Sequence, residues 1–553
     1  MEKATTHQVE TEVLVIGGGT AGCLAAMAAR REGKSVTIVE KGSSISHSGS
    51  LATGVDHYSA ILGEAPWDTP EAFIDKFKAN RTGLNDIKLV EIYARAAKAV
   101  FGYLENIGLP FKDAKTGTYF RIVGMGGSEP RTICFEGGRM KAIFRNQLSS
   151  LGVNIIERVA MKGLLTDSGR VTGAVGFHIR NGIFHIFKAK SVVVTTGGAT
   201  RLFPAATGRT FFTHAPPYNT GDGHAMAFNA GAILTNMEFP SCSVSPKGTD
   251  GPALTGLIGM GGFFINGLGE EFMKKYHPFG NHAPKNVVIN GMLKEFAAGR
   301  GPCYVDCRHI DKAAIDRIIK GILNERPTLL DYLQHKGIEI GRDPIPFELR
   351  EMEICGQGIK IDESCASSLE GLYAAGDCTN IGLAVSGACT LGYLAGKNAA
   401  QYSSSVPGYD ANTAQISQLR KNIYCSLNNE GFIRSSDLED EVRRIMSAHV
   451  GFNRNEVGLQ AAISALRSLK ENARHMIALS YHELMRANET QNLIDMSLVI
   501  ARAALERRES RSIPAHYRSD YPKQDDGKWR GFILMKKGHS GEMKVSYAPL
   551  CTS

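Results

Sequence analysis

The sequence predicts an α/β fold that combines a Rossmann-like domain, an inserted α+β capping domain and a C-terminal helical domain. A strand, a glycine-rich turn and a helix stand near the N-terminus, strand-like segments return at 191–199 and 371–377, and the last part of the chain has apolar residues at helical spacing. We therefore expect the first part of the Rossmann-like domain at 1–238, the capping domain at 239–354, the return of the Rossmann-like domain at 355–412 and the helical domain at 413–553.

The N-terminal unit is a strand, a helix and a second strand in succession. Residues 12–17 are apolar and short enough for a buried strand, and residues 20–33 have helical spacing and end at Gly33. Residues 35–40 form the second strand, which ends at Glu40. This βαβ unit is typical of a domain that binds a dinucleotide.

The middle of the chain contains a hairpin and then an inserted domain. Asn181-Gly182 separates two runs of alternating apolar residues, which is a strong hairpin signal. From about 240 to 350, proline and glycine recur and the expected helices are short, which indicates an insertion.

The C-terminal part is expected to be helical and then irregular. Apolar residues recur at helical spacing in 441–450, 458–487 and 492–510. The tail after Ser512 is polar and rich in turn residues.

Composition excludes several broad classes. The 553 residues are 43% hydrophobic and 21% charged, as in an ordinary globular protein with a large core, and the 61 glycines have no G-X-Y period. The net charge of +8 is spread along the chain, which favours anionic small molecules or an acidic protein partner over nucleic acid.

Nothing in the sequence indicates secretion or a membrane span. The first residues are polar, and apolar runs of about 18 residues are missing. The 11 cysteines are widely spread, without C-x-x-C pairs or the ferredoxin spacing, so no metal or cluster ligands are predicted. We expect a cytoplasmic protein with reduced thiols.

The glycine turn carries the clearest chemical signal. Gly17, Gly19 and Gly22 follow a strand and open a helix, and Glu40 stands about 20 residues further on. Gly17 permits the tight turn, Gly19 lets the backbone approach a pyrophosphate, and Gly22 lets helix and strand pack closely. The Glu40 carboxylate would accept hydrogen bonds from ribose hydroxyls.

Two later stretches favour FAD over NAD. Asp377 closes a strand where its carboxylate could accept a hydrogen bond from a ribityl hydroxyl, and residues 195–198 end another strand. These stretches lie hundreds of residues apart, as expected for an extended FAD that contacts an interrupted domain. A second G-x-G-x-x-G that could bind NAD separately is missing.

A series of motifs matches one known family. They are VLVIGGGTAG with Glu40-Lys41, His47-Ser48-Gly49, Ala52-Thr53-Gly54, Thr196-Gly197-Gly198, Thr220-Gly221-Asp222-Gly223, GLYAAGD, and Arg508-Glu509-Ser510-Arg511 ahead of Asp520-Tyr521-Pro522. The chain resembles the flavoprotein family of succinate dehydrogenase and fumarate reductase, and within it most resembles the adenylylsulfate reductase alpha subunit branch.

The resemblance implies an FAD-binding domain, a cap above the flavin, and hydride or electron-pair transfer at flavin N5. It also implies that the electron partner is a ferredoxin-like iron–sulfur subunit. We expect noncovalent FAD, because Ser48 aligns with the position where some relatives attach the flavin and His47 precedes it. The expected FAD-binding residues are Gly17, Gly19, Thr20, Ala21, Gly22, Glu40, Lys41, Ser48, Gly49, Thr53, Gly54, Thr196, Gly197, Asp222, Asp377, Ser386, Thr390 and Leu391.

The chain departs from its relatives where they bind substrate. Fumarate reductases and succinate dehydrogenases carry arginines in the stretches that match 257–262 and 386–390, and here both stretches lack a cation. Adenylylsulfate reductases have a basic stretch that matches 240–255, and here Lys247 is its one cation. We therefore expect a different small-molecule substrate, since carboxylates and sulfate need cationic partners.

The candidates for catalysis are Glu136, Arg139, His57 and Lys247, each of which could instead be structural. Phe211 matches an aromatic residue that relatives hold near the flavin, and would either stack on the substrate or belong to the core.

The expected function is an FAD-dependent oxidoreductase that serves as the flavoprotein subunit of a two-component system. Two alternatives stay open at this point. One is a self-contained oxidase that passes electrons to O2, as L-aspartate oxidases of this family do. The other is a flavin electron-relay protein without turnover.

Overall fold

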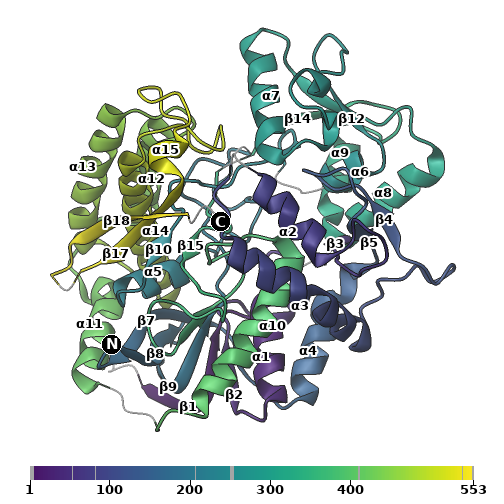
Figure 1. Cartoon of the computed structure of the whole chain (residues 1–553). Helices are drawn as coiled ribbons and strands as arrows, with labels where there is room; N and C mark the ends of the chain where they lie inside the picture. Colours follow the sequence, from purple (N-terminus) through teal and green to yellow (C-terminus); the bar gives the residue numbers. More distant parts are fainter. Residues whose placement is uncertain are drawn as a thin grey trace.

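The structure is a computed structural model of the whole chain (Figure 1). It describes residues 5–52, 54–80, 83–205, 207–249, 254–350, 352–408, 412–538 and 540–550, so Thr53 lies outside the described residues. Within these ranges, no helix is long and apolar enough to cross a membrane.

A seven-stranded sheet forms the centre of the molecule. Its strand order is β6-β2-β1-β9-β8-β7, with β16 beside β9. β1 pairs in parallel with β2 and β9, whereas β7, β8 and β9 pair in an antiparallel arm. The strands are β1 (Thr6–Ile16), β2 (Val36–Val39), β6 (Asn154–Ile156), β7 (Val159–Asp167), β8 (Arg170–His178), β9 (Phe184–Val194) and β16 (Leu372–Ala374).

The N-terminal βαβ unit and the hairpin at Asn181-Gly182 form as predicted. Gly182 has a φ of +70°, which glycine adopts at little cost. The return of the chain at 371–377 also forms as predicted, because β16 joins this sheet next to β9.

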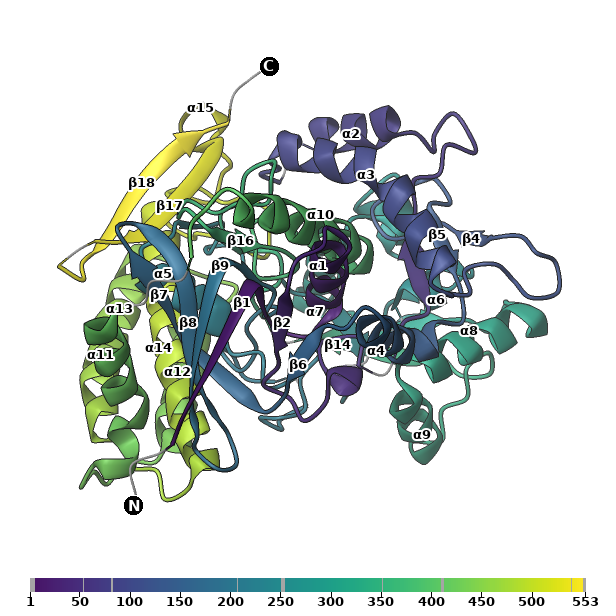
Figure 2. The ribbon, with the colours of Figure 1, turned by 90° about the horizontal axis from the view of Figure 1, so that it is seen from below.

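Two helices from opposite ends of this domain pack side by side on one face of the sheet (Figure 2). They are α1 (Thr20–Arg31) and α10 (Ala384–Ser403). A Cβ atom at Gly392 would lie 2.5 Å from the Ala21 carbonyl oxygen, and one at Gly396 would overlap the Ala25 carbonyl oxygen. Glycine at these positions therefore lets the two helix backbones touch.

The inserted segment is an α+β unit above the edge of the central sheet (Figure 1). It contains a four-stranded antiparallel sheet in the order β11-β14-β13-β12. Its elements are β11 (Val244–Pro246), α6 (Leu254–Gly259), β12 (Phe263–Ile265), α7 (Lys285–Ala297), β13 (Cys303–Asp306), α8 (Lys312–Glu325), α9 (Pro327–His335) and β14 (Ile345–Leu349). We call residues 239–354 the cap.

A smaller unit from the first part of the chain lies next to the cap. Its helices and strands are α2 (Pro70–Ala79), α3 (Ile87–Asn106), α4 (Met140–Ser150), β3 (His57–Ser59), β4 (Phe120–Ile122) and β5 (Thr132–Cys134). The three strands pair in the order β3-β5-β4, which positions the residues just before β3 against the cap.

The C-terminal domain is helical and ends in a hairpin. Its elements are α11 (Thr413–Tyr424), α12 (Ser435–Val450), α13 (Glu456–Asn472), α14 (Tyr481–Glu506), α15 (Asp526–Trp529), β17 (Gly531–Lys537) and β18 (Met543–Pro549). The expectation of an irregular tail was wrong for 531–549. The apolar side chains of Phe532, Ile533 and Met535 are buried, and β17 pairs with β10 (Leu234–Thr235).

Buried ion pairs join the C-terminal domain to the segment that leads into the cap. Arg507 Nε lies 2.7 Å from Glu238 Oε1, and Arg507 Nη1 lies 2.9 Å from Glu509 Oε1. The side chains of all three residues have no exposed surface. Arg507 also donates to the carbonyl oxygens of Trp529 and Gly531, so one guanidinium holds several segments together.

We predict that Arg507→Met lowers the free energy of unfolding by about 3–5 kcal/mol, because it leaves the buried Glu238 carboxylate without its cation and leaves Glu509 paired with Arg511 alone. Thermal and urea unfolding followed by circular dichroism measures the change. Arg502→Met is the matched control, since the Arg502–Glu506 pair on α14 is 38% and 40% exposed and should contribute less than about 1 kcal/mol. Equal losses in both variants would contradict the prediction.

Candidate active site

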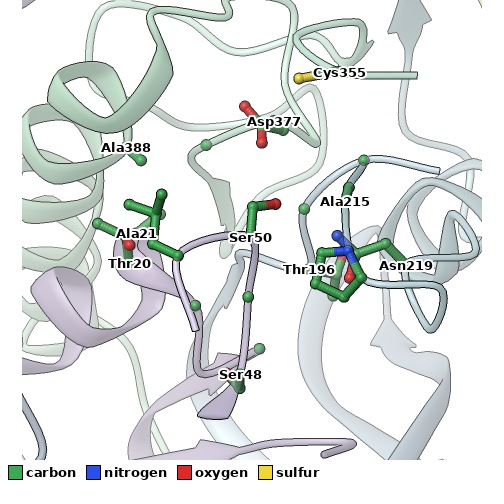
Figure 3. Close-up of a pocket in the computed structure, with 18 of the residues that line it drawn as sticks. Thr20, Ala21, Ser48, Ser50, Thr196, Ala215, Asn219, Cys355, Asp377 and Ala388 are labelled. Carbon is green, nitrogen blue, oxygen red and sulfur yellow. The ribbon is translucent and has the colours of Figure 1, made fainter. Parts of the chain in front are cut away.

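One elongated cavity runs from the glycine turn to the cap. Its empty volume is about 2140 Å³, including the part open to solvent. The β1–α1 turn, the loop at 47–57, the strand end at 195–198, the loop at 214–219 and the start of α10 form its walls, with the cap at one end. Figure 3 shows Thr20, Ser48, Thr196 and Asp377 lining the cavity from different segments.

A different constraint favours glycine at each of the three positions of the turn. Gly17 has a φ of +104°, and a Cβ there would lie 2.5 Å from the Thr195 carbonyl oxygen. A Cβ at Gly22 would overlap the Gly17 carbonyl oxygen. Gly19 has a φ of −65° and a ψ of −173°, which any residue adopts, and its Cβ would meet only Gly49 Cα at 3.9 Å.

The protein itself therefore does not require glycine at position 19. Gly19 is the residue before α1 and lines the cavity, so a side chain there would occupy ligand space. The start of α1 adds free backbone N–H groups and the positive end of the helix dipole. This arrangement fits a pyrophosphate.

Glu40 is held in place by the glycine turn. Its carboxylate accepts hydrogen bonds from the backbone N–H groups of Gly18 and Gly42, each at 2.6 Å. Each carboxylate oxygen keeps a second lone pair, which a ribose hydroxyl can use.

Lys41 lines the same wall but is already paired. Its Nζ lies 2.6 Å from Asp222 Oδ2 and 3.0 Å from Glu489 Oε1 on α14. Burial lowers the pKa of Lys41, but these two carboxylates outweigh burial and raise it. Lys41 and Asp222 therefore connect the cavity wall to the C-terminal domain.

Two polar groups of the wall fit a bound ligand. Ser48 Oγ is buried and has no hydrogen-bond partner among the described residues. Burial raises the pKa of the Asp377 carboxyl group, and a hydrogen bond with Cys355 offsets only part of that rise. Buried polar groups are normally fully hydrogen-bonded, so both side chains suit a cofactor that carries hydroxyl and ring polar atoms.

Most of the expected FAD-binding residues line the cavity. They are Gly17, Gly19, Thr20, Ala21, Glu40, Lys41, Ser48, Gly49, Thr196, Gly197, Asp222 and Asp377. Gly22 and Gly54 lie behind the wall, where they permit close backbone packing.

The residues of helix α10 that line the cavity are not the expected ones. Ser386, Thr390 and Leu391 point into the protein, where the Ser386 hydroxyl accepts from Tyr93 at 3.0 Å, and Ala384, Val385 and Ala388 line the cavity instead. The sequence did not fix the rotation of this helix about its axis.

The four expected catalytic residues separate into two groups. His57 lines the cavity at its cap end. Glu136, Arg139 and Lys247 are exposed on the surface and do not line it. The Glu136 carboxylate pairs with the exposed Lys320, and Lys247 follows β11 on the outer side of the cap.

The cap end of the cavity contains charged residues that the sequence did not reveal. They are Asp56, Lys285, Glu325, Arg350 and Glu353. They come from separate segments, and no spacing rule brings them together. A possible signal was the position of Lys285 at the first turn of α7, where a cation is electrostatically unusual.

Lys285 and Arg350 bring positive charge to this end. Arg350 Nη2 lies 3.2 Å from Glu353 Oε1, and both side chains are buried. Lys285 forms no ion pair with a described residue; its side chain keeps exposed surface and lines the cavity. Desolvation by the surrounding protein and then the charge of Arg350 lower the pKa of Lys285.

The stretches that lack arginines lie beside this cavity. Residues 254–256 of α6, just ahead of the first stretch, line it, as does Ala388 of the second. Neither stretch supplies a cation there. Lys285 and Arg350 therefore provide positive charge from other positions than those expected from the resemblance.

Asp56, His57 and Glu325 form a close group beside Lys285. The Asp56 carboxylate is hydrogen-bonded to His57 Nδ1 and to Glu325. Two carboxylates and an imidazole could bind a divalent cation, but here they bind one another through protons, and the neighbouring Lys285 opposes a further cation.

The cavity, the glycine turn and the acidic strand end are the features of a flavin-binding fold. A family profile described as "FAD binding domain" matches residues 12–392, and one described as "Fumarate reductase flavoprotein C-term" matches residues 439–553. The chain belongs to the succinate dehydrogenase and fumarate reductase flavoprotein family. The expected fold class is thereby confirmed, as are FAD as cofactor and an oxidoreductase activity.

Individual relatives cover nearly the whole flavoprotein. It is 29% identical to an "Uncharacterized FAD-dependent oxidoreductase" of Methanocaldococcus jannaschii over 98% of this chain and 99% of that protein. It is 28% identical to a subunit of the "Fumarate reductase (CoM/CoB)" of Methanothermobacter marburgensis over 96% and 97%.

Solved structures show the same fold. An adenylylsulfate reductase from Archaeoglobus fulgidus superposes with a TM-score of 0.91 at 27% identity, covering 100% of this chain and 97% of that one. An adenosine-5-phosphosulfate reductase in complex with sulfite, as a covalent adduct, gives the same score and identity over 99% and 97%. The resemblance to the adenylylsulfate reductase branch is therefore confirmed.

We predict that Gly19→Val weakens FAD binding by more than about 100-fold while the fold is retained, because the new side chain enters ligand space and its Cβ meets only Gly49 Cα, at 3.9 Å. Absorption spectra of the purified protein and calorimetric titration of the apoprotein with FAD measure the loss. Gly102→Ala in α3 is the control, since a Cβ there meets nothing within 4 Å and should leave FAD binding unchanged. Wild-type FAD affinity in Gly19→Val would refute the assignment.

Proposed function

We propose that this protein is the flavoprotein subunit of a two-component oxidoreductase that exchanges an electron pair between a small anionic molecule and a ferredoxin-like iron–sulfur protein. The observation that carries the proposal is the pair of cations, Lys285 and Arg350, at the cap end of the cavity whose other end holds the FAD-binding residues. Bound FAD supplies the electron-pair exchange.

The two cations have different parts in binding an anion. Arg350 is already paired with Glu353, which fixes its guanidinium and leaves Nε without a partner among the described residues. Lys285 forms no ion pair with a described carboxylate, although the charge of Glu353 offsets part of the desolvation that lowers its pKa, so an anion can pair with Lys285 directly. The hydroxyls of Ser241, Ser243 and Thr255 line the same end and can complete the hydrogen bonds.

The cap also limits access of water. Lys285 and Glu325 belong to it, and Arg350 lies where the chain leaves it, so substrate-binding groups and the cover come from one unit. A substrate held between the cap and the FAD-binding wall is surrounded by protein groups of fixed orientation, which strengthens electrostatic interactions with it.

Two observations support a separate electron partner: the name of one relative, and a group of exposed aromatic residues beside the cavity. The relative from Methanothermobacter marburgensis is named as one subunit of its enzyme. Next to the cavity lies an aromatic rim formed by Phe211, Phe212 and Tyr218, which are 49%, 47% and 51% exposed. Exposed apolar groups beside a cofactor site are typical of a protein-binding surface, and Tyr218 itself lines the cavity.

Phe211 has a specific place in this rim. The guanidinium groups of Arg201 and Arg486 lie 5.4 Å and 4.5 Å from its ring centroid. It is thus neither a core residue nor part of the cavity wall. Cation–π contacts hold the ring while about half of the residue's surface stays exposed, as a docking residue requires.

We predict that Lys285→Met raises the dissociation constant of sulfite by about 10- to 100-fold, because a charge-assisted contact is lost. Sulfite titration at neutral pH, followed by the visible absorption of bound FAD, measures it. Lys312→Met is the matched control: Lys312 is likewise the first residue of a cap helix and likewise exposed, but it lies outside the cavity. Unchanged sulfite affinity in Lys285→Met would overturn the proposed anion site.

We also predict that reduced ferredoxin reduces the bound FAD, and that the rate falls as salt rises. The chain carries a net charge of +8 and ferredoxins are acidic, and salt screens such attraction over about 8–10 Å. Stopped-flow mixing at low and high salt measures the rate. No reduction at either salt concentration, with fast reoxidation of the FAD in air, would favour the O2-using oxidase. Slow reoxidation of the reduced FAD at both salt concentrations would favour the relay protein.

A further inference from the structure

The junction between the FAD-binding domain and the cap contains a buried acid cluster formed by Asp56, His57 and Glu325. Asp56 and His57 stand at the start of β3, and Glu325 is the last residue of α8 in the cap. One side-chain N or O atom of each residue lies within 4.8 Å of those of the other two. All three residues line the cavity, so the cluster exists only where the two units meet.

The cap is shaped to receive the Asp56 side chain. A Cβ atom at Gly321, inside α8, would lie 2.8 Å from Asp56 Oδ2, and one at Gly256, inside α6, would lie 3.7 Å from it. Glycine inside a helix costs about 1 kcal/mol relative to alanine. Gly321 thus gives up helix stability where α8 must make room for a carboxylate from the other domain.

Protons hold the cluster together. Burial raises the pKa of Glu325, and the charge of Asp56 raises it further. Burial alone would lower the pKa of His57, but the charge of Asp56 and the hydrogen bond to it raise that pKa to about 9. Burial would raise the pKa of Asp56, but the charge and hydrogen bond of His57 lower it.

We propose that binding of a small anion in the cavity is coupled to proton uptake by the Asp56–His57–Glu325 cluster, in which Glu325 acts as a neutral carboxylic acid. The proposal rests on the proposed function, because it takes the substrate to be an anion. Glu325 is a positioning residue here: its O–H donates to Asp56, which holds His57.

The charge at the cap end explains the coupling. With His57 and Glu325 protonated, the cations are His57, Lys285 and Arg350, and the anions are Asp56 and Glu353. Loss of both protons leaves two cations and three anions, so the end of the cavity changes from net positive to net negative. An anion therefore binds more tightly to the protonated cluster and, by linkage, raises its proton affinity.

The other titratable groups around the cluster act in known directions. Lys285 of α7 lowers the pKa of His57, and Arg326, just after α8, lowers that of Glu325. Cys134 of β5 stays a neutral thiol, since burial and then Asp56 raise its pKa to about 12. Neither cation reverses the raised pKa of Glu325 or His57.

The coupling also places a transferable proton at the substrate end of the cavity. A cluster loaded with protons can donate one to a substrate that accepts an electron pair: the N–H bond at His57 Nε2 breaks and a bond from that proton to the substrate forms, while bound FAD, reduced by the iron–sulfur partner, would supply the electron pair. His57 Nδ1 is bound to Asp56, which leaves Nε2 for this proton. In the reverse reaction the same nitrogen accepts the proton.

The first test counts protons in the wild-type holoprotein. Calorimetric titration with sulfate, whose charge is constant over this range, is run at pH 8.5 in two buffers of different ionisation enthalpy. Proton uptake on sulfate binding, and affinity that weakens as pH rises, are expected. Binding without proton uptake, or with pH-independent affinity, would overturn the proposal; so would no binding at all.

The second test uses Glu325→Gln, which mimics the neutral acid, and Glu339→Gln, an exposed cap carboxylate, as control. Glu325→Gln should lose most of the pH dependence of sulfate affinity, and the control should keep it. Equal pH dependence in Glu325→Gln and wild type would overturn the proposal. If Glu325→Gln does not fold, His57→Gln removes the second titrating group of the cluster, and its sulfate affinity is compared with wild type over the same pH range.

Thermal melting reports the same group without a ligand. A carboxyl group whose pKa is raised in the folded state contributes stability at low pH that is lost as pH rises. Glu325→Gln should therefore gain in Tm relative to wild type as pH rises from 5. A constant difference would overturn the neutral acid. If Lys285→Met leaves the sulfite affinity unchanged, the proposed function is refuted instead, and the pH dependence of the Tm difference for Glu325→Gln still stands.

Discussion

The close contact between α1 and α10 determines where everything else in the cavity lies. Gly392 and Gly396 let the α10 backbone reach the carbonyl oxygens of Ala21 and Ala25. Both helices begin at the cavity, so this contact fixes the pyrophosphate-binding turn relative to the residues at the start of α10. Larger side chains at these two positions would separate the helices, and with them the two ends of the FAD-binding wall.

The cap completes a site that the FAD-binding domain cannot form alone. The domain supplies Asp56 and His57, and the cap supplies Lys285 and Glu325. The positive charge that relatives are expected to draw from α6 and α10 comes here from Lys285 and Arg350. The fold is thus shared with the family, whereas the charges at the substrate end are arranged differently.

Local signals account for what the sequence could predict. The βαβ unit, the hairpin at Asn181-Gly182 and the residues Glu40 and Asp377 depend on short stretches whose chemistry is visible in the order of residues. Contacts between distant segments were not visible. Lys285 and Glu325 reach the cavity through the packing of the cap. Ser386 faces the protein interior, which could not be predicted because helical spacing shows which residues share a face but not which face packs against the cavity.

The ion pairs of Lys41 show that the three parts of the chain are not independent modules. One of the two carboxylates paired with this lysine is Glu489, on a helix of the C-terminal domain, and Asp222 also accepts a hydrogen bond from Asn492 of the same helix at 2.7 Å. An FAD-binding domain separated from α14 would keep a cation in the wall of its nucleotide site with one counter-ion removed. Exchange of C-terminal domains between relatives would therefore alter the electrostatics of cofactor binding.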